Sequence, residues 1–131
     1  MYTIMAYSKA VEGNREVVEH FKAREFACKD GSDLILISPG LVDILHRIRQ
    51  RFNAPVIITS GYRTVSYNKR VRGAPKSTHL LGLAADIVVK GVTPAKVAAY
   101  ADTLMQESGG IGEYSNFVHI DVRHQKARWH G

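Results

Sequence analysis

An aspartate in the middle of an apolar run constrains this chain more than any other feature of its sequence. The run Leu-Ala-Ala-Asp-Ile-Val-Val covers residues 83–89 and has Asp86 at its centre. It predicts a β-strand, because β-branched residues are enriched in strands. A buried and unpaired carboxylate is costly, so Asp86 should be paired with a cation or bound to a metal ion. An ion pair with Arg63 or Arg70 is one way to meet this requirement.

A histidine precedes the predicted strand at an informative spacing. His79 lies seven positions before Asp86, whereas neighbours on one face of a helix are three or four positions apart. The spacing therefore favours a loop that carries His79, a turn at Gly82 and a strand that carries Asp86. Glycine suits that turn because it adopts backbone conformations that other residues avoid.

A second histidine lies on a later predicted strand, residues 117–122. Side chains alternate between the two faces of a strand, so Phe117, His119 and Asp121 share one face. A histidine and a carboxylate are therefore expected side by side on that face.

The residues His79, Asp86 and His119 form a candidate zinc site. Three protein ligands leave one coordination position for water, which is the arrangement of a catalytic rather than a structural zinc. A histidine near a strand is more often an ordinary hydrogen-bonded polar residue. The residue types alone leave both interpretations open.

The remaining pattern predicts a single small α+β domain over residues 1–131, with a mainly antiparallel sheet and helices packed on it. Ser38 followed by Pro39 predicts the start of a helix that continues to residue 52, and Thr93 followed by Pro94 predicts another to about residue 107. We also expect a short helix over 13–21, a helical turn over 66–71, strands over 56–59 and 83–89, an antiparallel pair over 111–113 and 117–122, and a polar tail over 123–131.

Charge and cysteine content narrow the classes of function. Eighteen Lys and Arg against twelve Asp and Glu give a net charge of +6, which favours anionic partners. A specific nucleic-acid module is not expected, because no recognised nucleic-acid-binding motif accompanies the charge. The single cysteine, Cys28, excludes a disulfide framework. No apolar run approaches the roughly 20 residues that span a bilayer, so membrane insertion is not expected.

The segment from Ser77 to Asp86 has the form S-x-H-x-x-G-x-A-x-D, which resembles the zinc signature of metallopeptidase family fifteen. The flanking segments Ser-Gly-Tyr-Arg at 60–63, Gly-Ile-Gly-Glu-Tyr at 110–114 and Phe-Val-His-Ile-Asp at 117–121 resemble its arginine and second-histidine segments. The resemblance covers about residues 38–129. It is greatest to subfamily A, the group of D-alanyl-D-alanine carboxypeptidases and phage L-alanyl-D-glutamate endopeptidases, and it implies their hedgehog/DD-peptidase-like fold.

This resemblance implies roles for individual residues. His79, Asp86 and His119 would bind one Zn²⁺ per chain, and Arg63 would polarise the scissile carbonyl. Ser77 would line the substrate pocket. Tyr62 and Tyr114 would shape the same pocket or serve as packing residues.

One position departs from the family pattern. Many members carry an acidic general base three residues before the second histidine, where this chain has Asn116, and an amide cannot take a proton from water. We expect Asp121 to be the base, with Glu113 as the second candidate. Alternatively, Asp121 orients a ligand histidine through its free ring N–H.

The expected function is hydrolysis of a peptide bond in peptidoglycan stem peptides, of the D-Ala-D-Ala carboxypeptidase or L-Ala-D-Glu endopeptidase type. The alternative is a zinc-containing cell-wall-binding domain without catalysis. The first residues lack the pattern of a signal peptide, so we expect a protein made in the cytoplasm that acts on the wall after release, as phage and prophage endolysins do. We also expect it to be a monomer.

Overall fold

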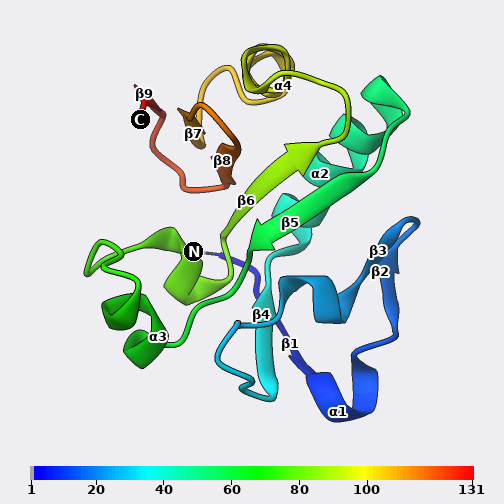
Figure 1. Cartoon of the computed structure of the whole chain (residues 1–131), viewed down its shortest axis with the longest axis vertical. Coiled ribbons are helices and arrows are strands. Elements are labelled where there is room, and N and C mark those ends of the chain that lie inside the picture. The colour runs from blue at the N-terminus through cyan, green and yellow to red at the C-terminus, as the bar shows by residue number, and fades with distance from the viewer. Residues whose placement is uncertain (1) are drawn as a thin grey trace.

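A computed structural model describes residues 2–131 of the chain (Figure 1). The amino-terminal part contains β1 (Met5–Ser8), α1 (Lys9–Glu12), β2 (Glu16–Val18), β3 (Phe21–Lys22), the 3-10 helix η1 (Ala23–Phe26) and β4 (Leu34–Ile37). The remainder contains α2 (Pro39–Phe52), β5 (Val56–Ser60), α3 (Val65–Arg70), the 3-10 helix η2 (Thr78–Leu81), β6 (Ala84–Val89), α4 (Pro94–Leu104), β7 (Gly110–Glu113), β8 (Val118–Asp121) and β9 (Ala127–His130).

The principal sheet has five strands in the order β5-β6-β8-β7-β9. Its first four strands pair antiparallel, and β9 pairs parallel with β7. Two smaller antiparallel pairs, β1 with β4 and β2 with β3, lie at the other end of the molecule in Figure 1. This arrangement confirms the predicted α+β class and its mainly antiparallel sheet.

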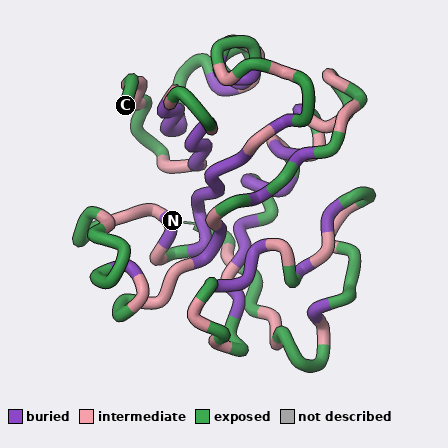
Figure 2. The backbone as a smooth tube through the Cα atoms, in the orientation of Figure 1, coloured by how far each residue is buried: buried purple, intermediate pink, exposed green. Residues whose placement is uncertain are grey.

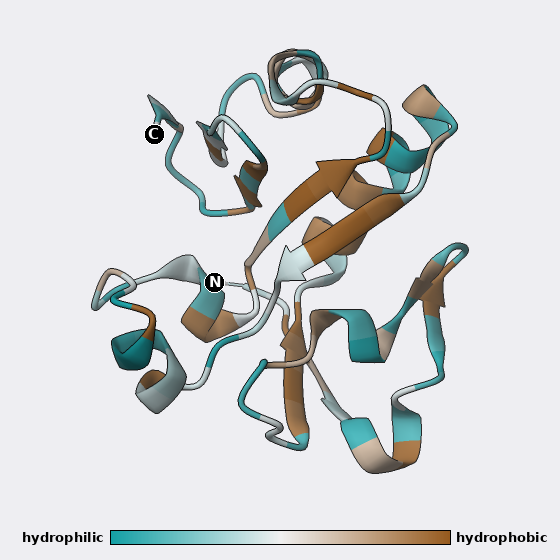
Figure 3. Ribbon diagram, viewed as in Figure 1, coloured by the Kyte–Doolittle hydropathy of each residue, from teal (hydrophilic) through white to brown (hydrophobic). Residues whose placement is uncertain are grey.

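The two long helices cover one face of the principal sheet. Helix α2 packs against β5 and β6, and α4 packs against β6, β7 and β8. Buried residues of the strands lie at this interface, where the tube is purple in Figure 2, and β5 and β6 are largely apolar, as their brown colour in Figure 3 shows. Ile87, Val118 and Ile120 are at most 1% exposed. The opposite face of β6 and β8 carries Asp86 and His119, so the candidate ligands lie on the sheet face that the helices do not cover.

The predicted helix starts are confirmed. Ser38 caps α2 by accepting a hydrogen bond from the backbone N–H of Leu41, and Thr93 caps α4 through that of Lys96. Helix α4 ends at Leu104, three residues before the predicted end. The guanidinium of Arg128 donates to the backbone oxygens of Met105 and Gly109, and these bonds hold the chain after the helix in a non-helical path.

Two other expectations are corrected. Residues 13–21 do not form a helix, because the chain reverses at His20, whose φ is 75°, and forms the β2–β3 hairpin. The polar tail, for which no strand was predicted, contains β9, which extends the sheet beyond β7. Within residues 2–131, no helix combines the length and the apolar character that crossing a membrane requires.

Candidate metal centre

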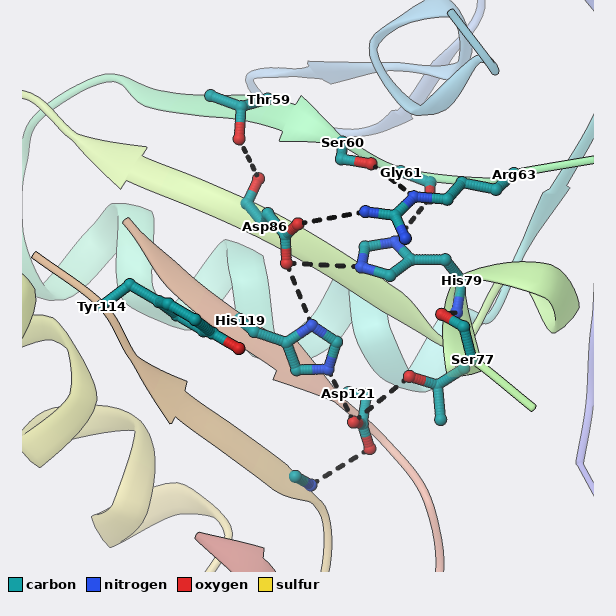
Figure 4. Close-up of polar contacts among 12 residues, drawn as sticks. Thr59, Ser60, Gly61, Arg63, Ser77, His79, Asp86, Tyr114, His119 and Asp121 are labelled. Carbon is teal, nitrogen blue, oxygen red and sulfur yellow. Dashed lines mark hydrogen bonds and ion pairs between the residues drawn. The ribbon is translucent and has the colours of Figure 1, made fainter. Parts of the chain in front are cut away.

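Three separate elements bring the predicted ligands together (Figure 4). His79 comes from η2, and Asp86 and His119 are directly opposite each other on β6 and β8. Oδ1 of Asp86 lies 2.9 Å from Nδ1 of His119 and 3.3 Å from Nε2 of His79. One ligand atom from each residue lies within 4.8 Å of the others. All three residues are buried, so the cluster has the composition and spacing of a metal site.

The backbone fixes the ring of His79. Its Nδ1 lies 2.7 Å from the carbonyl oxygen of Gly61, and a carbonyl only accepts, so Nδ1 carries a proton and Nε2 is the ring nitrogen that faces the cluster. Ser77 caps η2 by accepting from the N–H of His79. Gly82 ends η2 with a φ of 73°, which confirms the predicted glycine turn between the histidine and the strand.

A buried carboxylate fixes the ring of His119. Its Nε2 lies 2.8 Å from Oδ2 of Asp121, a side chain with no exposed surface. The same carboxylate also accepts from the backbone N–H groups of Gly110 and Arg123, the guanidinium of Arg123 and the hydroxyl of Thr78. Asp121 therefore lies behind His119, at the ring edge opposite Asp86, with its oxygens already occupied.

The charges of the cluster favour ionised carboxylates. Burial raises the pKa of Asp86, but hydrogen bonds and charge from His119 and His79 outweigh it and hold this pKa well below its usual range. Burial also raises the pKa of Asp121, and the bonds from His119 and Arg123 again reverse the direction. Burial lowers the pKa of His119, yet its two carboxylate neighbours raise it overall. A divalent cation fits this donor set, because it would take the place of the proton between His119 and Asp86.

Arg63 approaches the cluster from the end of β5. Its Nη2 lies 3.6 Å from Oδ2 of Asp86, while Nε donates to Ser60 and Nη1 donates to Asn68. The buried Asn68 donates in turn to the carbonyl oxygen of Ala74. These contacts hold the guanidinium beside the three candidate ligands.

A cavity of about 380 Å³ opens beside the cluster. Among the predicted pocket residues, Ser77 and Tyr114 line it together with Arg63 and the three ligands. Tyr62 does not line it and lies in the hydrophobic core at 9% exposure, which supports the packing alternative for this residue. The rest of the lining consists of Ala74, Lys76, Thr78, Phe117, Arg123 and Trp129.

Glu113 and Asn116 lie outside this cavity. Glu113 lines a separate cavity against α4, and its carboxylate lies 3.9 Å from Nε2 of His130. Glu113 pairs with Val118, whose side chain faces the core, whereas His119 faces the opposite side of the sheet. Asn116 is exposed in the turn before β8. The structure therefore brings neither side chain to the ligands.

Two residues that the sequence pattern did not single out also belong to the site. Arg123 binds Asp121 with both nitrogens of its fork, and Trp129 lies with its ring centroid 5.2 Å from that of His119. The one signal in the sequence for Trp129 was that it is a solitary tryptophan in a polar tail. The pairing of β9 with β7 is what positions Trp129 beside the site.

Comparison with known proteins gives consistent matches. The family model described as Peptidase M15 matches residues 15–121. The peptidoglycan L,D-endopeptidase MepK of Escherichia coli strain K12 is 38% identical over 95 residues, which are 66% of this chain and 51% of that protein. The probable peptidoglycan L,D-endopeptidase MepK of Haemophilus influenzae is 38% identical over 77 residues, 53% of this chain and 40% of that protein. The chain spans about half the length of the curated relatives it matches. Because the family match extends over most of the chain, it shows that the chain belongs to the peptidase M15 family.

Proposed function

We propose that this protein is a zinc-dependent endopeptidase that hydrolyses an L,D peptide bond in the stem peptides of peptidoglycan. The observation that carries the proposal is the buried cluster of His79, Asp86 and His119 at the wall of a cavity that also contains Arg63. The relatives named above are described as peptidoglycan L,D-endopeptidases, which favours this type over a carboxypeptidase.

The donor set suits one zinc ion held by Nε2 of His79, Nδ1 of His119 and the carboxylate of Asp86. When bound, zinc supplies Lewis acidity and a hydroxide nucleophile near neutral pH. The carbonyl of Gly61 and the carboxylate of Asp121 hold the two rings from behind, so each presents a proton-free nitrogen to the ion. All of these groups come from one chain, so a monomer is sufficient.

Arg63 binds and polarises the scissile carbonyl in this proposal. Its guanidinium is always charged and is held by Ser60 and Asn68. The guanidinium can therefore stabilise the negative charge that develops on the carbonyl oxygen with little rearrangement. A preorganised donor of this kind stabilises the transition state more than one that must first reorient. Ser77 and Tyr114 contribute to the wall that holds the peptide.

Asp121 has an orienting role in this proposal. A general base must reach the reacting water, whereas Asp121 is buried behind His119 and is saturated by donors. Its contact with the Nε2 edge of His119 is the one expected of a carboxylate that fixes a ligand histidine.

One observation favours the alternative of a zinc-containing wall-binding domain without turnover. Among the described residues that line the cavity, Asp86 carries the one carboxylate, so no second acid lines the cavity as a candidate general base. A net charge of +6 would hold such a domain at an anionic wall.

Digestion of purified sacculi and of soluble muropeptides by the zinc-loaded protein tests these functions. Mass spectrometry of the products separates cleavage of an L,D bond from release of terminal D-alanine. His119→Ala provides the control that lacks a metal ligand. If the protein sediments with sacculi but leaves them uncleaved, the alternative of a wall-binding domain without catalysis is supported. Release of D-alanine alone would overturn the endopeptidase assignment.

A further inference from the structure

Three aromatic side chains form one wall of the cavity beside the metal cluster. The rings of Tyr114 and Phe117 are stacked, with centroids 4.3 Å apart and planes inclined by 7°. Trp129 reaches the same wall from β9, and its indole Nε1 donates to the Tyr114 hydroxyl at 2.9 Å. The strand at the sheet edge thus makes direct contact with a side chain of the site.

The direction of that hydrogen bond leaves one proton available. An indole N–H only donates, so the oxygen of Tyr114 is the acceptor. A phenol carries its own O–H as well. Among residues 2–131, Trp129 is the one hydrogen-bond partner found for this hydroxyl. Its O–H therefore remains free to donate to a molecule in the cavity.

The hydroxyl lies on the far side of the cluster from Arg63. Figure 4 shows the ring of Tyr114 above β7 with its oxygen directed toward His119, while Arg63 approaches from the end of β5. Both residues line the same cavity as Asp86. A carbonyl placed over the cluster would consequently meet one donor from each side.

The packing around Trp129 makes this donor rigid. A Cβ atom at Gly112 would lie 2.5 Å from the indole, so the ring rests directly on a glycine of β7. The guanidinium of Arg123 covers the ring at 5.4 Å from its centroid and is itself bound to Asp121. A donor held in this way needs little reorganisation when charge develops nearby.

We propose that the Tyr114 hydroxyl is a catalytic hydrogen-bond donor to the oxygen of the scissile carbonyl, and that Trp129 is the residue that positions it. As the new C–O bond forms at the carbonyl carbon, the π electron pair moves onto the carbonyl oxygen. The hydrogen bond from Tyr114 strengthens as that charge develops, and no proton is transferred. This inference rests on the proposed peptidase function and adds a second stabilising group to Arg63.

Tyr114→Phe tests the proposal, because it removes the hydroxyl and keeps the stacked ring. We expect kcat to fall about 10- to 100-fold with KM within about twofold of its original value, since the lost interaction strengthens only in the transition state. Zinc content should stay at the wild-type level. Trp129→Phe should give a smaller fall in kcat, because it removes only the group that aligns the hydroxyl. Tyr100→Phe, which removes a phenol that packs on Phe52 away from the cavity, is the matched control and should be unchanged.

A second readout does not depend on turnover. Trp129 is the single tryptophan of the chain, so its fluorescence reports directly on this wall. Binding of a phosphinic analogue of L-Ala–D-Glu, which places a tetrahedral anion over the cluster, should weaken about 10- to 100-fold in zinc-loaded Tyr114→Phe. Emission of Trp129 should shift in Tyr114→Phe and stay constant in Tyr100→Phe.

These measurements separate the two proposals. If the wild-type protein cleaves no muropeptide, the proposed function fails, while the affinity for the phosphinic analogue still tests Tyr114. An unchanged kcat in Tyr114→Phe, or a rise in KM alone, would overturn the catalytic role. Equal affinity of the two proteins for the analogue, or no binding to either, would overturn it as well.

Discussion

The Nε2 atom of His119 lies 2.8 Å from Oδ2 of Asp121, which follows it by two positions on β8 and is completely buried. Alternation along a strand puts the two side chains on the same face, so this contact follows directly from the local sequence His-Ile-Asp. The carboxylate holds one edge of the imidazole and thereby turns the other edge toward Asp86.

Asp121→Asn should lower zinc affinity about 10- to 100-fold, because the substitution keeps the shape of the side chain and removes the charge that orients His119. Competition with a chelator of known affinity measures this loss. A fall in kcat by orders of magnitude at unchanged zinc affinity would instead identify Asp121 as the general base. Asp102→Asn removes a carboxylate that pairs with Arg128 at the surface, and it should leave zinc affinity unchanged.

Removal of the metal should destabilise the folded protein. A ligand that binds only the native state raises the free energy of unfolding by about 4 kcal/mol when its concentration is one thousand times its Kd. We therefore expect a chelator to lower the Tm of the wild-type protein and to leave that of His119→Ala unchanged, because the variant lacks one of the three ligands. Differential scanning calorimetry with and without zinc measures both effects. His130→Ala, at an exposed position of β9, should respond to the chelator as the wild type does.

Arg63→Lys should lower kcat/KM by about 100-fold while zinc content is retained. A lysine keeps the positive charge but cannot reproduce the fork that donates to Ser60 and Asn68 at once. The developing charge on the carbonyl oxygen would then lose a prepositioned donor. Steady-state kinetics on a purified muropeptide provides the measurement. Arg47→Lys alters only a surface pair with Asp43, and an equal loss in both variants would contradict a specific role for Arg63.

Stability at acidic pH should depend on Asp30. Hydrogen bonds from the hydroxyl and backbone N–H of Ser32 and from the hydroxyl of Thr64 hold the pKa of Asp30 well below its usual range. A carboxylate whose pKa is lowered by folding stabilises the native state above its unfolded pKa of about 3.9, and this contribution is lost as the pH falls further. Urea denaturation between pH 7 and pH 3 should therefore show a steeper decline for the wild type than for Asp30→Asn. Parallel declines would contradict the assignment.

The helix starts and the central strands were predictable because their signals are local. Ser38-Pro39 and Thr93-Pro94 supply a cap and a first turn within two residues. The apolar run around Asp86 could form a stable strand only if its carboxylate found partners. The order histidine, glycine, aspartate predicted a loop, a turn and a strand. The structure contains the turn at Gly82 and the strand, but His79 lies in the 3-10 helix η2 rather than in a loop.

The parts that were not predictable depend on pairing over long distances. Residues 13–21 have helical spacing of their apolar side chains, yet pairing between β2 and β3 determines their structure. Strand β9 is polar and becomes a strand only because β7 offers a free edge. The contribution of Trp129 to the cavity follows from that pairing, which no local pattern encodes.

Gly82→Ala should destabilise the protein more than the same substitution at Gly91. Both glycines have positive φ, 73° and 75°, and a left-handed conformation costs an alanine about 1 kcal/mol. At Gly82 the added Cβ would also lie 2.4 Å from the carbonyl oxygen of Leu36, whereas at Gly91 nothing lies within 4 Å. A contact with backbone cannot be relieved by a rotamer change. We therefore expect the free energy of unfolding of Gly82→Ala to fall by a further amount of about 1–3 kcal/mol, the usual cost of overpacking. Urea denaturation of the two variants isolates that difference. Zinc affinity should fall in Gly82→Ala alone, because Gly82 closes the turn that carries His79, and equal effects at both positions would mean that the turn does not place the ligand.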